Sequence, residues 1–181
     1  IVINVHWLGN IVKDYILQQN CYGLKIKIID EKGAILGTGG GIKNALPFLG
    51  DEPFWLFNAD VISDYRPDPS RTLISGQLGH LVLVDNPSHH KSGDFGLCDE
   101  LVNQQKKPRP LTYSGISILS PDVVKFIPND VFPLEPVLLT NVSRHLITGE
   151  YYNGLWIDVG SQERLNFAET QLKKNRENNF V

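Results

Sequence analysis

The chain has 181 residues, 41% of them hydrophobic, which suits one folded domain rather than a disordered segment. Its net charge of −3 argues against a nucleic-acid partner held by phosphate neutralisation. No apolar run approaches the roughly 18 residues of a membrane span, and no signal peptide is recognisable. Two cysteines, Cys21 and Cys98, form neither a disulfide framework nor a metal knuckle, so we expect a cytoplasmic protein without a membrane partner.

Strands and helices alternate along the first part of the chain, and strands dominate later. The expected early elements are a strand at 1–5, a helix at 8–16, a strand at 24–30, a helix from Ile42 that stops or kinks at Pro47, and a strand at 53–60. The expected later elements are strands at 80–84, 95–102 (at the sheet edge) and 111–119, helices starting at Ser120 and covering 134–146 with Gly149 just past the end, a strand-to-turn segment at 156–160, and a helix capped by Ser161. This order predicts an α/β fold with a Rossmann-like, mixed and mostly parallel sheet flanked by helices. Residues 1–172 are expected to form one domain, followed by a polar, frayed tail at 173–181.

Four glycines fall within the five residues Gly37-Thr38-Gly39-Gly40-Gly41. Glycine leaves the backbone open to a ligand and permits positive φ, so we expect a loop whose N–H groups surround phosphates at the start of a helix. The alternative is a glycine-rich turn that only lets a helix and a strand pack closely. The ligand interpretation is preferred because close packing needs fewer glycines.

Two aspartates follow predicted strands, at the carboxyl ends where open α/β sheets bind ligands. Asp60 ends a strongly apolar segment, where a buried carboxylate is costly unless it is paired or binds a metal. Asp158 lies much farther along the chain, between Trp156 and Gly160. Two carboxylates together with phosphate oxygens are ligands that Mg²⁺ accepts, so we predict that this pair holds Mg²⁺ across a glycine-lined crevice. Structural roles as a cap or a turn acid are the alternative.

Two other patterns are weaker. Adjacent His89 and His90 rarely point the same way, and no third ligand stands at a useful spacing, so a polar loop is favoured over a zinc site. The glycine run also partly mimics a dinucleotide-binding fingerprint, with Asp60 near the position of its ribose-binding acid. However, Ile42 takes the place of the third glycine, and a loop separates the run from the preceding strand. An NAD(P)-binding oxidoreductase stays an alternative.

Four segments resemble, in order, motifs of the sugar-1-phosphate nucleotidyltransferase family and cover nearly the whole chain. Leu36–Ile42 is similar to the L-G-T-[AG]-G segment, Phe57–Asp60 to the strand ending N-[GA]-D, Leu111–Ile116 to the sugar-contact segment, and Trp156–Ser161 to the W-x-D-x-G-[TS] segment. The resemblance implies transfer of a nucleotidyl group from a nucleoside triphosphate to a sugar 1-phosphate, giving a nucleotide-sugar and pyrophosphate. Within the family, residues 80–87, His89-His90 and 93–95 resemble the N-acetylmuramate-1-phosphate uridylyltransferases of bacterial cell-wall recycling, which use UTP. Mannose-1-phosphate guanylyltransferases are the alternative.

The resemblance also implies roles by position. Asp60 and Asp158 would be the catalytic residues and would bind Mg²⁺. The nucleotide pocket would contain Thr38, Gly39, Gly40 and Asn58, and the sugar would lie near Asn86, Ser114 and Gly115.

Two parts of the family pattern do not match. The N-terminal loop G-x-G-[TE]-R-x-R-P, which supplies a phosphate cradle and a catalytic arginine, has no counterpart here. A strand, that loop and a helix are therefore expected ahead of Ile1, and the chain as printed is not expected to catalyse. The E-K-P segment of the family has only the counterpart Lys106-Lys107-Pro108. A glycosyltransferase of related fold, which would usually carry D-x-D, and a non-catalytic nucleotide-sugar sensor remain alternatives.

Overall fold

The computed structural model describes residues 1–31 and 33–178. It divides into two compact units, which are described separately. The first contains Ile1–Phe54 and Ser120–Asn141, and the second contains Trp55–Leu119 and the chain from Val142 onward.

The first unit carries a parallel strand pair and most of the helices. Its elements are β1 (Val2–Val5), α1 (Gly9–Gln18), the 3₁₀ turn η1 (Asn20–Gly23), β2 (Lys27–Asp30), α2 (Gly37–Leu49), α3 (Asp122–Lys125) and most of α4 (Glu135–Ser143). β1 pairs in parallel with β2, and α1 connects them by way of η1, as the sequence predicts. Val5 is the one buried residue of β1, and within α1 Ile16 is buried whereas Ile11 and Tyr15 are exposed.

The glycine run forms no loop. It is the first turn of α2, so the prediction of a loop followed by a helix from Ile42 is wrong. The helix also continues through Pro47 to Leu49. A proline removes one backbone donor, and close to a helix end this loss is tolerated, here with the N–H of Gly50 still bonded to the carbonyl of Leu46 at 3.1 Å.

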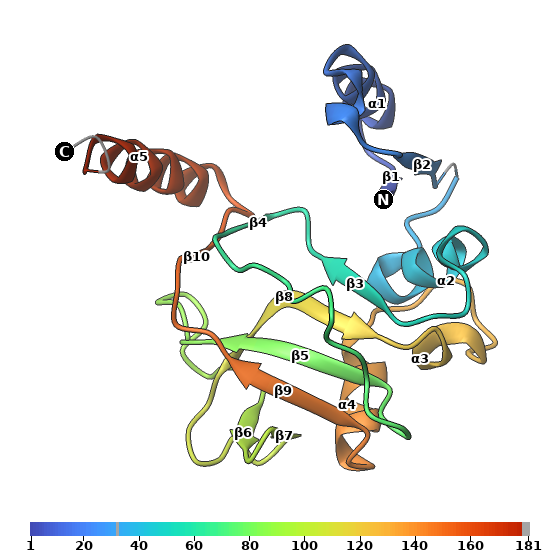
Figure 1. The fold of residues 1–181 in the computed structure, drawn as a ribbon, viewed down its shortest axis with the longest axis vertical. Helices are drawn as coiled ribbons and strands as arrows, with labels where there is room; N and C mark the ends of the chain where they lie inside the picture. The colour runs from blue at the N-terminus through green and yellow to red at the C-terminus, as the bar shows by residue number, and fades with distance from the viewer. Residues whose placement is uncertain (32, 179–181) are drawn as a thin grey trace. The chain divides into compact units, whose positions relative to one another are not determined.

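The second unit is built on a six-stranded sheet with the order β3-β8-β5-β9-β7-β6. These strands are β3 (Phe54–Phe57), β5 (Gly79–Val84), β6 (Gly96–Cys98), β7 (Leu101–Asn103), β8 (Thr112–Leu119) and β9 (Ile147–Tyr151). β4 (Val61–Ser63) and β10 (Trp156–Asp158) form a separate antiparallel pair, and α5 (Gln162–Asn178) follows β10. Figure 1 shows β8, β5 and β9 side by side at the centre of the sheet.

The sheet is mixed, as the larger number of strands late in the chain predicts. β5 pairs in parallel with β9 and antiparallel with β8, and β7 pairs antiparallel with both β6 and β9. The parallel pairs β1–β2 and β5–β9 are joined by long connections, and the β6–β7 pair is a short antiparallel hairpin. All six residues of β5 are buried, and Leu81, Val82 and Leu83 have no exposed surface, which places the core of this unit at β5.

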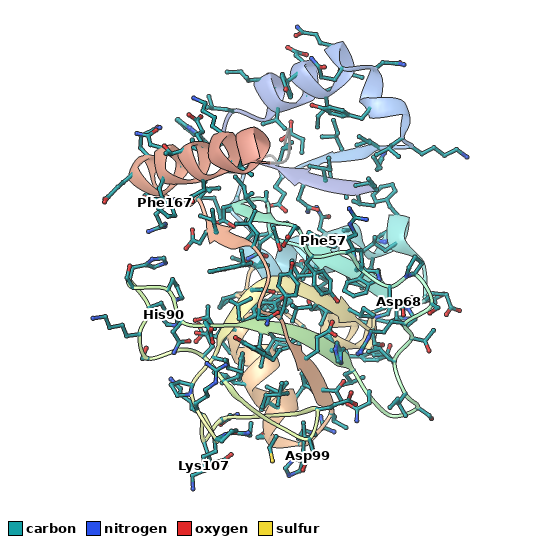
Figure 2. All side chains as sticks on the ribbon, turned by 60° about the vertical axis from the view of Figure 1, so that its left-hand side comes forward. Phe57, Asp68, His90, Asp99, Lys107 and Phe167 are labelled. Atoms are coloured by element: carbon teal, nitrogen blue, oxygen red, sulfur yellow. The ribbon has the colours of Figure 1, made fainter. Side chains whose placement is uncertain are left out.

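Two predicted elements in the later part of the chain differ from the structure. The single strand expected at 95–102 is a hairpin of β6 and β7, with Asp99 (Figure 2) and Glu100 at positive φ in its turn. The helix expected at 134–146 ends at Ser143, and the chain then forms β9, which the sequence did not reveal. Gly149 lies inside β9 rather than at a helix end. A Cβ there would stand 2.8 Å from the carbonyl oxygen of Leu81, so close packing on β5 explains the glycine.

The C-terminal segment is helical through residue 178, which includes the first part of the tail predicted at 173–181. Residues 179–181 lie outside the described residues. Across the part of the chain that is described, no helix is long and apolar enough to cross a membrane.

Candidate functional site

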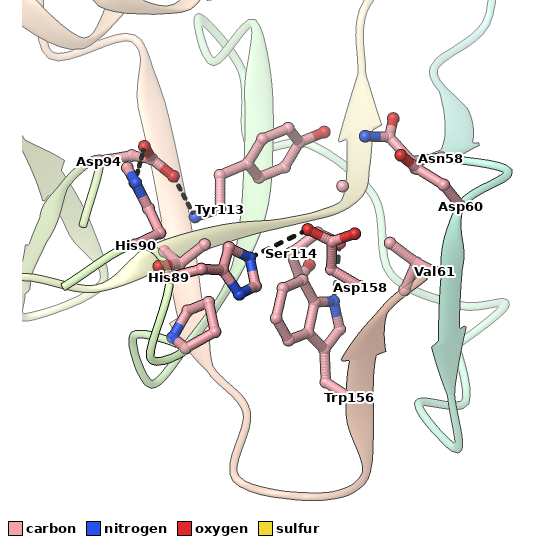
Figure 3. Close-up of a pocket in the computed structure, with 13 residues that line it drawn as sticks. Asn58, Asp60, Val61, His89, His90, Asp94, Tyr113, Ser114, Trp156 and Asp158 are labelled. Carbon is pink, nitrogen blue, oxygen red and sulfur yellow. Dashed lines mark hydrogen bonds and ion pairs between the residues drawn. The ribbon is translucent and has the colours of Figure 1, made fainter. Parts of the chain in front are cut away.

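A pocket of about 360 Å³ lies in the second unit and gathers residues from distant parts of the chain (Figure 3). Its lining consists of Asn58, Asp60, Val61, Pro87, His89, His90, Asp94, Thr112, Tyr113, Ser114, Gly115, Trp156 and Asp158. Five residues singled out in the sequence therefore meet in one pocket: Asn58, Asp60, Ser114, Gly115 and Asp158. Asp60 and Asp158 lie in one pocket, as predicted, and their binding of Mg²⁺ stays a prediction.

The two carboxylates flank Gly160. A Cβ built on this glycine would lie 3.0 Å from Asp158 Oδ1 and 3.4 Å from Asp60 Oδ2, so both oxygens face the same small volume. The backbone fixes this approach, because the N–H of Val159 donates to the carbonyl of Asp60 at 2.8 Å. A side chain at position 160 would fill the space between the carboxylates, so glycine keeps that space open.

Asp60 is exposed, and the expectation of a buried carboxylate at a strand end is wrong. β3 ends at Phe57, and three further residues carry the chain into a turn before β4. Within the described residues, the Asp60 carboxylate accepts no hydrogen bond and forms no ion pair. It is thus an anionic group on the pocket wall with its oxygens available.

Asp158 is surrounded by donors. Its Oδ1 accepts the N–H of Gly160 at 2.7 Å and lies 3.2 Å from Nη2 of Arg164, while its Oδ2 lies 3.2 Å from Nε2 of His89. Partial burial works against ionisation, but the Gly160 hydrogen bond, Arg164 and His89 outweigh it and hold the pKa of Asp158 below its usual value. The carboxylate is therefore charged at neutral pH.

The start of β8 forms one wall of the pocket. Gly115 has a φ of +78°, and its carbonyl accepts the N–H of Asn58 at 2.8 Å. The indole N–H of Trp156 donates to the carbonyl of Ser114 at 2.9 Å and ties β10 to this wall. Burial raises the pKa of Tyr113 to about 12, partly offset by its hydrogen bond with Ser117, so its hydroxyl is neutral.

The loop after β5 brings two histidines into the pocket. His89 faces Asp158, whereas Nε2 of His90 lies 2.7 Å from Oδ1 of Asp94, whose Oδ2 accepts the backbone N–H of Tyr113 at 2.8 Å. The two rings thus pair with different carboxylates, as expected for adjacent residues. Of the described residues, no group of three or more His, Cys, Asp or Glu side chains could hold a metal ion.

Asn86 does not line the pocket. Its Nδ2 donates to the carbonyls of Lys91 and Pro110, and its Oδ1 accepts the hydroxyl of Thr112, so the whole amide is used in holding the histidine loop against β8. Lys106 also holds this loop in place, because its ammonium donates hydrogen bonds to the carbonyls of Ser92 and Gly93. Both residues shape the loop, and the predicted contact of Asn86 with a sugar stays a prediction.

The remaining predicted nucleotide residues lie in the first unit. Thr38 is exposed, whereas Gly39 and Gly40 are buried. A Cβ on Gly39 would stand 2.4 Å from the ring of Phe132, and one on Gly40 would stand 2.2 Å from the carbonyl oxygen of Asp130. Close packing of helix α2 on the 130–132 segment therefore explains these two glycines, and their contact with a nucleotide stays a prediction.

His89, His90, Asp94 and Tyr113 were not among the predicted site residues. The signal that could have found the first three is their place in a polar loop directly after β5, at the carboxyl end of a buried strand, where α/β sheets bind ligands. No sequence pattern indicates that His89 and Asp158 pair across 69 residues.

Comparison with proteins of known function gives two relatives of the same kind. The chain is 36% identical over 179 residues to the N-acetylmuramate α-1-phosphate uridylyltransferase of Neisseria meningitidis serogroup B, covering 93% of the chain and 76% of that protein. It is 30% identical over 187 residues to the enzyme of the same name from Caulobacter vibrioides, covering 94% of the chain and 76% of that protein. No protein-family model matches the sequence.

Solved structures confirm the fold. HddC from Yersinia pseudotuberculosis, in complex with GMP-PN, superposes with a TM-score of 0.74 at 20% identity, over 94% of this chain and 77% of HddC. The predicted α/β class with a mixed sheet and helices is therefore correct.

Proposed function

The chain belongs to the sugar-1-phosphate nucleotidyltransferase family, and from this premise we propose that it transfers the uridylyl group of UTP to N-acetylmuramate 1-phosphate. The reaction class follows from membership of the family. The choice of base and sugar is the proposal, and it is supported by the two relatives that carry out this transfer.

The observation that carries the proposal is the meeting of Asp60 and Asp158 around Gly160 in a polar pocket. In the transfer, an oxygen of the sugar phosphate attacks the α-phosphorus of the nucleotide, a new P–O bond forms, and the bond to pyrophosphate breaks. Such a transfer needs positioning and charge neutralisation rather than a protein nucleophile. The pocket supplies donors and carboxylates and no activated nucleophile, which fits this chemistry.

Asp60 and Asp158 are the residues that would hold Mg²⁺. The fit rests on their chemistry: both are oxygen ligands facing one space, and the Asp60 carboxylate accepts no bond from the described residues. Two carboxylates are the usual protein contribution for Mg²⁺, which takes its other ligands from waters and phosphates. Bound there, the ion would neutralise charge on the phosphates.

The other pocket residues would bind and orient the sugar phosphate. Ser114 and Gly115 present the backbone of β8 beside Asn58, and His90 offers a ring nitrogen fixed by Asp94. Thr38, Gly39 and Gly40 of α2 are proposed to contact the nucleotide. The two histidines that line the pocket are partly exposed, so the ring nitrogen of each that faces no carboxylate could hydrogen-bond a sugar substituent.

The metal role is tested with Asp60→Asn, which keeps the size of the side chain and removes its charge. In the full-length protein, we expect pyrophosphate release to fall by about a hundredfold or more, the scale of losing a charge-stabilising group, with little change in thermal stability. The matched control is Asp99→Asn in the β6–β7 turn, which should keep wild-type activity. Wild-type turnover by the Asp60 variant would show that this carboxylate does not serve the metal.

The substrate is tested by measuring pyrophosphate release from UTP, GTP, CTP and dTTP with N-acetylmuramate 1-phosphate, mannose 1-phosphate and glucose 1-phosphate. We expect the highest kcat/KM for UTP with N-acetylmuramate 1-phosphate. A higher value for GTP with mannose 1-phosphate would replace this assignment with a mannose-1-phosphate guanylyltransferase.

A further inference from the structure

A cationic side chain reaches the carboxylate pair from helix α5. Arg164 lies in the first turn of this helix, where its backbone N–H lies 3.3 Å from the Oγ of Ser161. A Cβ on Gly160 would stand 3.0 Å from Arg164 Nη2, as close as it would stand to Asp158 Oδ1. One guanidinium and two carboxylates therefore surround the same glycine.

The three charged side chains around Gly160 differ in how many hydrogen-bond partners they have. Oδ1 of Asp158 accepts the N–H of Gly160 at 2.7 Å and forms an ion pair with Nη2 of Arg164 at 3.2 Å. Asp60, by contrast, receives no bond from the described residues. The Nε of Arg164 is buried and has no acceptor among the described residues, so the guanidinium keeps a donor that this state of the protein does not satisfy.

We propose that Arg164 is a built-in counter-ion of the Asp60–Asp158 pair, a positioning residue that holds Asp158 in place and opposes a divalent cation until nucleotide phosphates arrive. This inference rests on the proposed function, because it takes the pair to be the metal site. Arg164 offsets part of the negative charge that would attract the ion. A unit charge a few ångströms from a divalent ion changes its binding by about tenfold or more, even with strong screening.

Nucleotide phosphates would weaken the opposition between Arg164 and a divalent cation, for a chemical reason. Their oxygens accept hydrogen bonds from a guanidinium and also ligate a divalent cation. With nucleotide present, phosphate oxygens would accept hydrogen bonds from Arg164, whose charge would then oppose a cation at Asp158 less strongly. The site would then bind the ion together with the nucleotide rather than before it.

The test measures Mn²⁺ binding to the nucleotide-free, full-length protein by electron paramagnetic resonance. We expect Arg164→Gln to bind Mn²⁺ about tenfold more tightly than the wild type, and Arg164→Lys, which keeps the charge, to stay close to the wild type. Arg144→Gln removes the same charge from an exposed residue that does not line the pocket, so it should leave the affinity unchanged. A folding defect would weaken metal binding, so a gain in affinity cannot come from misfolding.

An affinity of Arg164→Gln no higher than that of the wild type overturns the proposal, including the case in which neither protein binds Mn²⁺ over the range tested. Adding UTP separates this failure from failure of the proposed function. If, after subtraction of the Mn²⁺ that UTP alone holds, Asp60→Asn abolishes Mn²⁺ binding in the presence of UTP while Arg164→Gln shows no gain without it, only the counter-ion role is wrong. If Asp60→Asn leaves the UTP-dependent Mn²⁺ binding intact, the metal site itself is wrong.

Discussion

Substituting Gly115 by alanine tests how the pocket wall is built. The glycine has a φ of +78°, which costs an alanine about 1–2 kcal/mol. The new Cβ would also stand 2.7 Å from Cγ and Nδ2 of Asn58, and such crowding typically costs about 1–3 kcal/mol. Reduced freedom of the unfolded chain returns about 0.5–1 kcal/mol. We expect the free energy of unfolding to fall by about 2–3 kcal/mol.

A double-mutant cycle separates the two costs. Asn58→Gly removes every side-chain atom that the new Cβ meets, including the Asn58 Cβ at 2.8 Å, but keeps the backbone hydrogen bond from position 58 to the Gly115 carbonyl. In that background Gly115→Ala should cost only the backbone strain, about 1 kcal/mol. Denaturant unfolding of the four proteins measures the difference. An equal cost in both backgrounds would mean that Asn58 does not restrict position 115, and that the two residues do not approach closely.

Three further predictions concern other parts of the molecule. His80, Tyr65 and Arg71 hold the pKa of Glu150 at about 2 against the effect of burial, so Glu150→Gln should lower stability by about 2 kcal/mol at pH 7. Because the pKa of Glu150 is lower in the folded than in the unfolded protein, the stability that this carboxylate contributes is present above pH ~4.3 and is lost as the pH falls through 2. If the wild type and Glu150→Gln differed in stability by the same amount from pH 7 to pH 2, this explanation would be wrong. Gly39→Ala should destabilise the protein by about 1–3 kcal/mol in thermal unfolding, because the Cβ meets the ring of Phe132; a gain in stability, as helix propensity alone predicts, would refute the packing role. Gly160→Ala should reduce pyrophosphate release by about tenfold or more with the fold intact, because its Cβ enters the space between the carboxylates; unchanged kcat would show that this space is not needed.

The elements that the sequence predicted well have a strong local signal. β5, β8 and the helix after Ser161 show apolar runs or caps that are recognisable within a few residues. β9 was not recognised because Gly149 reads as a helix stop, whereas in the structure it lets β9 pack against β5 and β7. The need for a glycine at position 149 is visible only when the neighbouring strands β5 and β7 are in place.

In the candidate site, too, some features have a local sequence signal and others depend on contacts between distant residues. Asp60 and Asp158 could be paired from the sequence, because each follows a predicted strand and each matches a family motif. The expected burial of Asp60 was wrong, since the length of β3 depends on where its neighbour in the sheet stops pairing. The pairing of His89 with Asp158 depends on two loops meeting in space.

The family, the α/β class, most strands and the two acidic positions could be predicted from the amino-acid sequence, because these depend on residue type and local spacing. Tertiary structure decided the rest. It set the glycine run as the packed start of α2, placed the two histidines in the pocket, and brought the Arg164 guanidinium to the carboxylates. Each of these three features depends on which groups from distant parts of the chain come within a few ångströms of one another. The local charge and packing that result exist only in the folded protein.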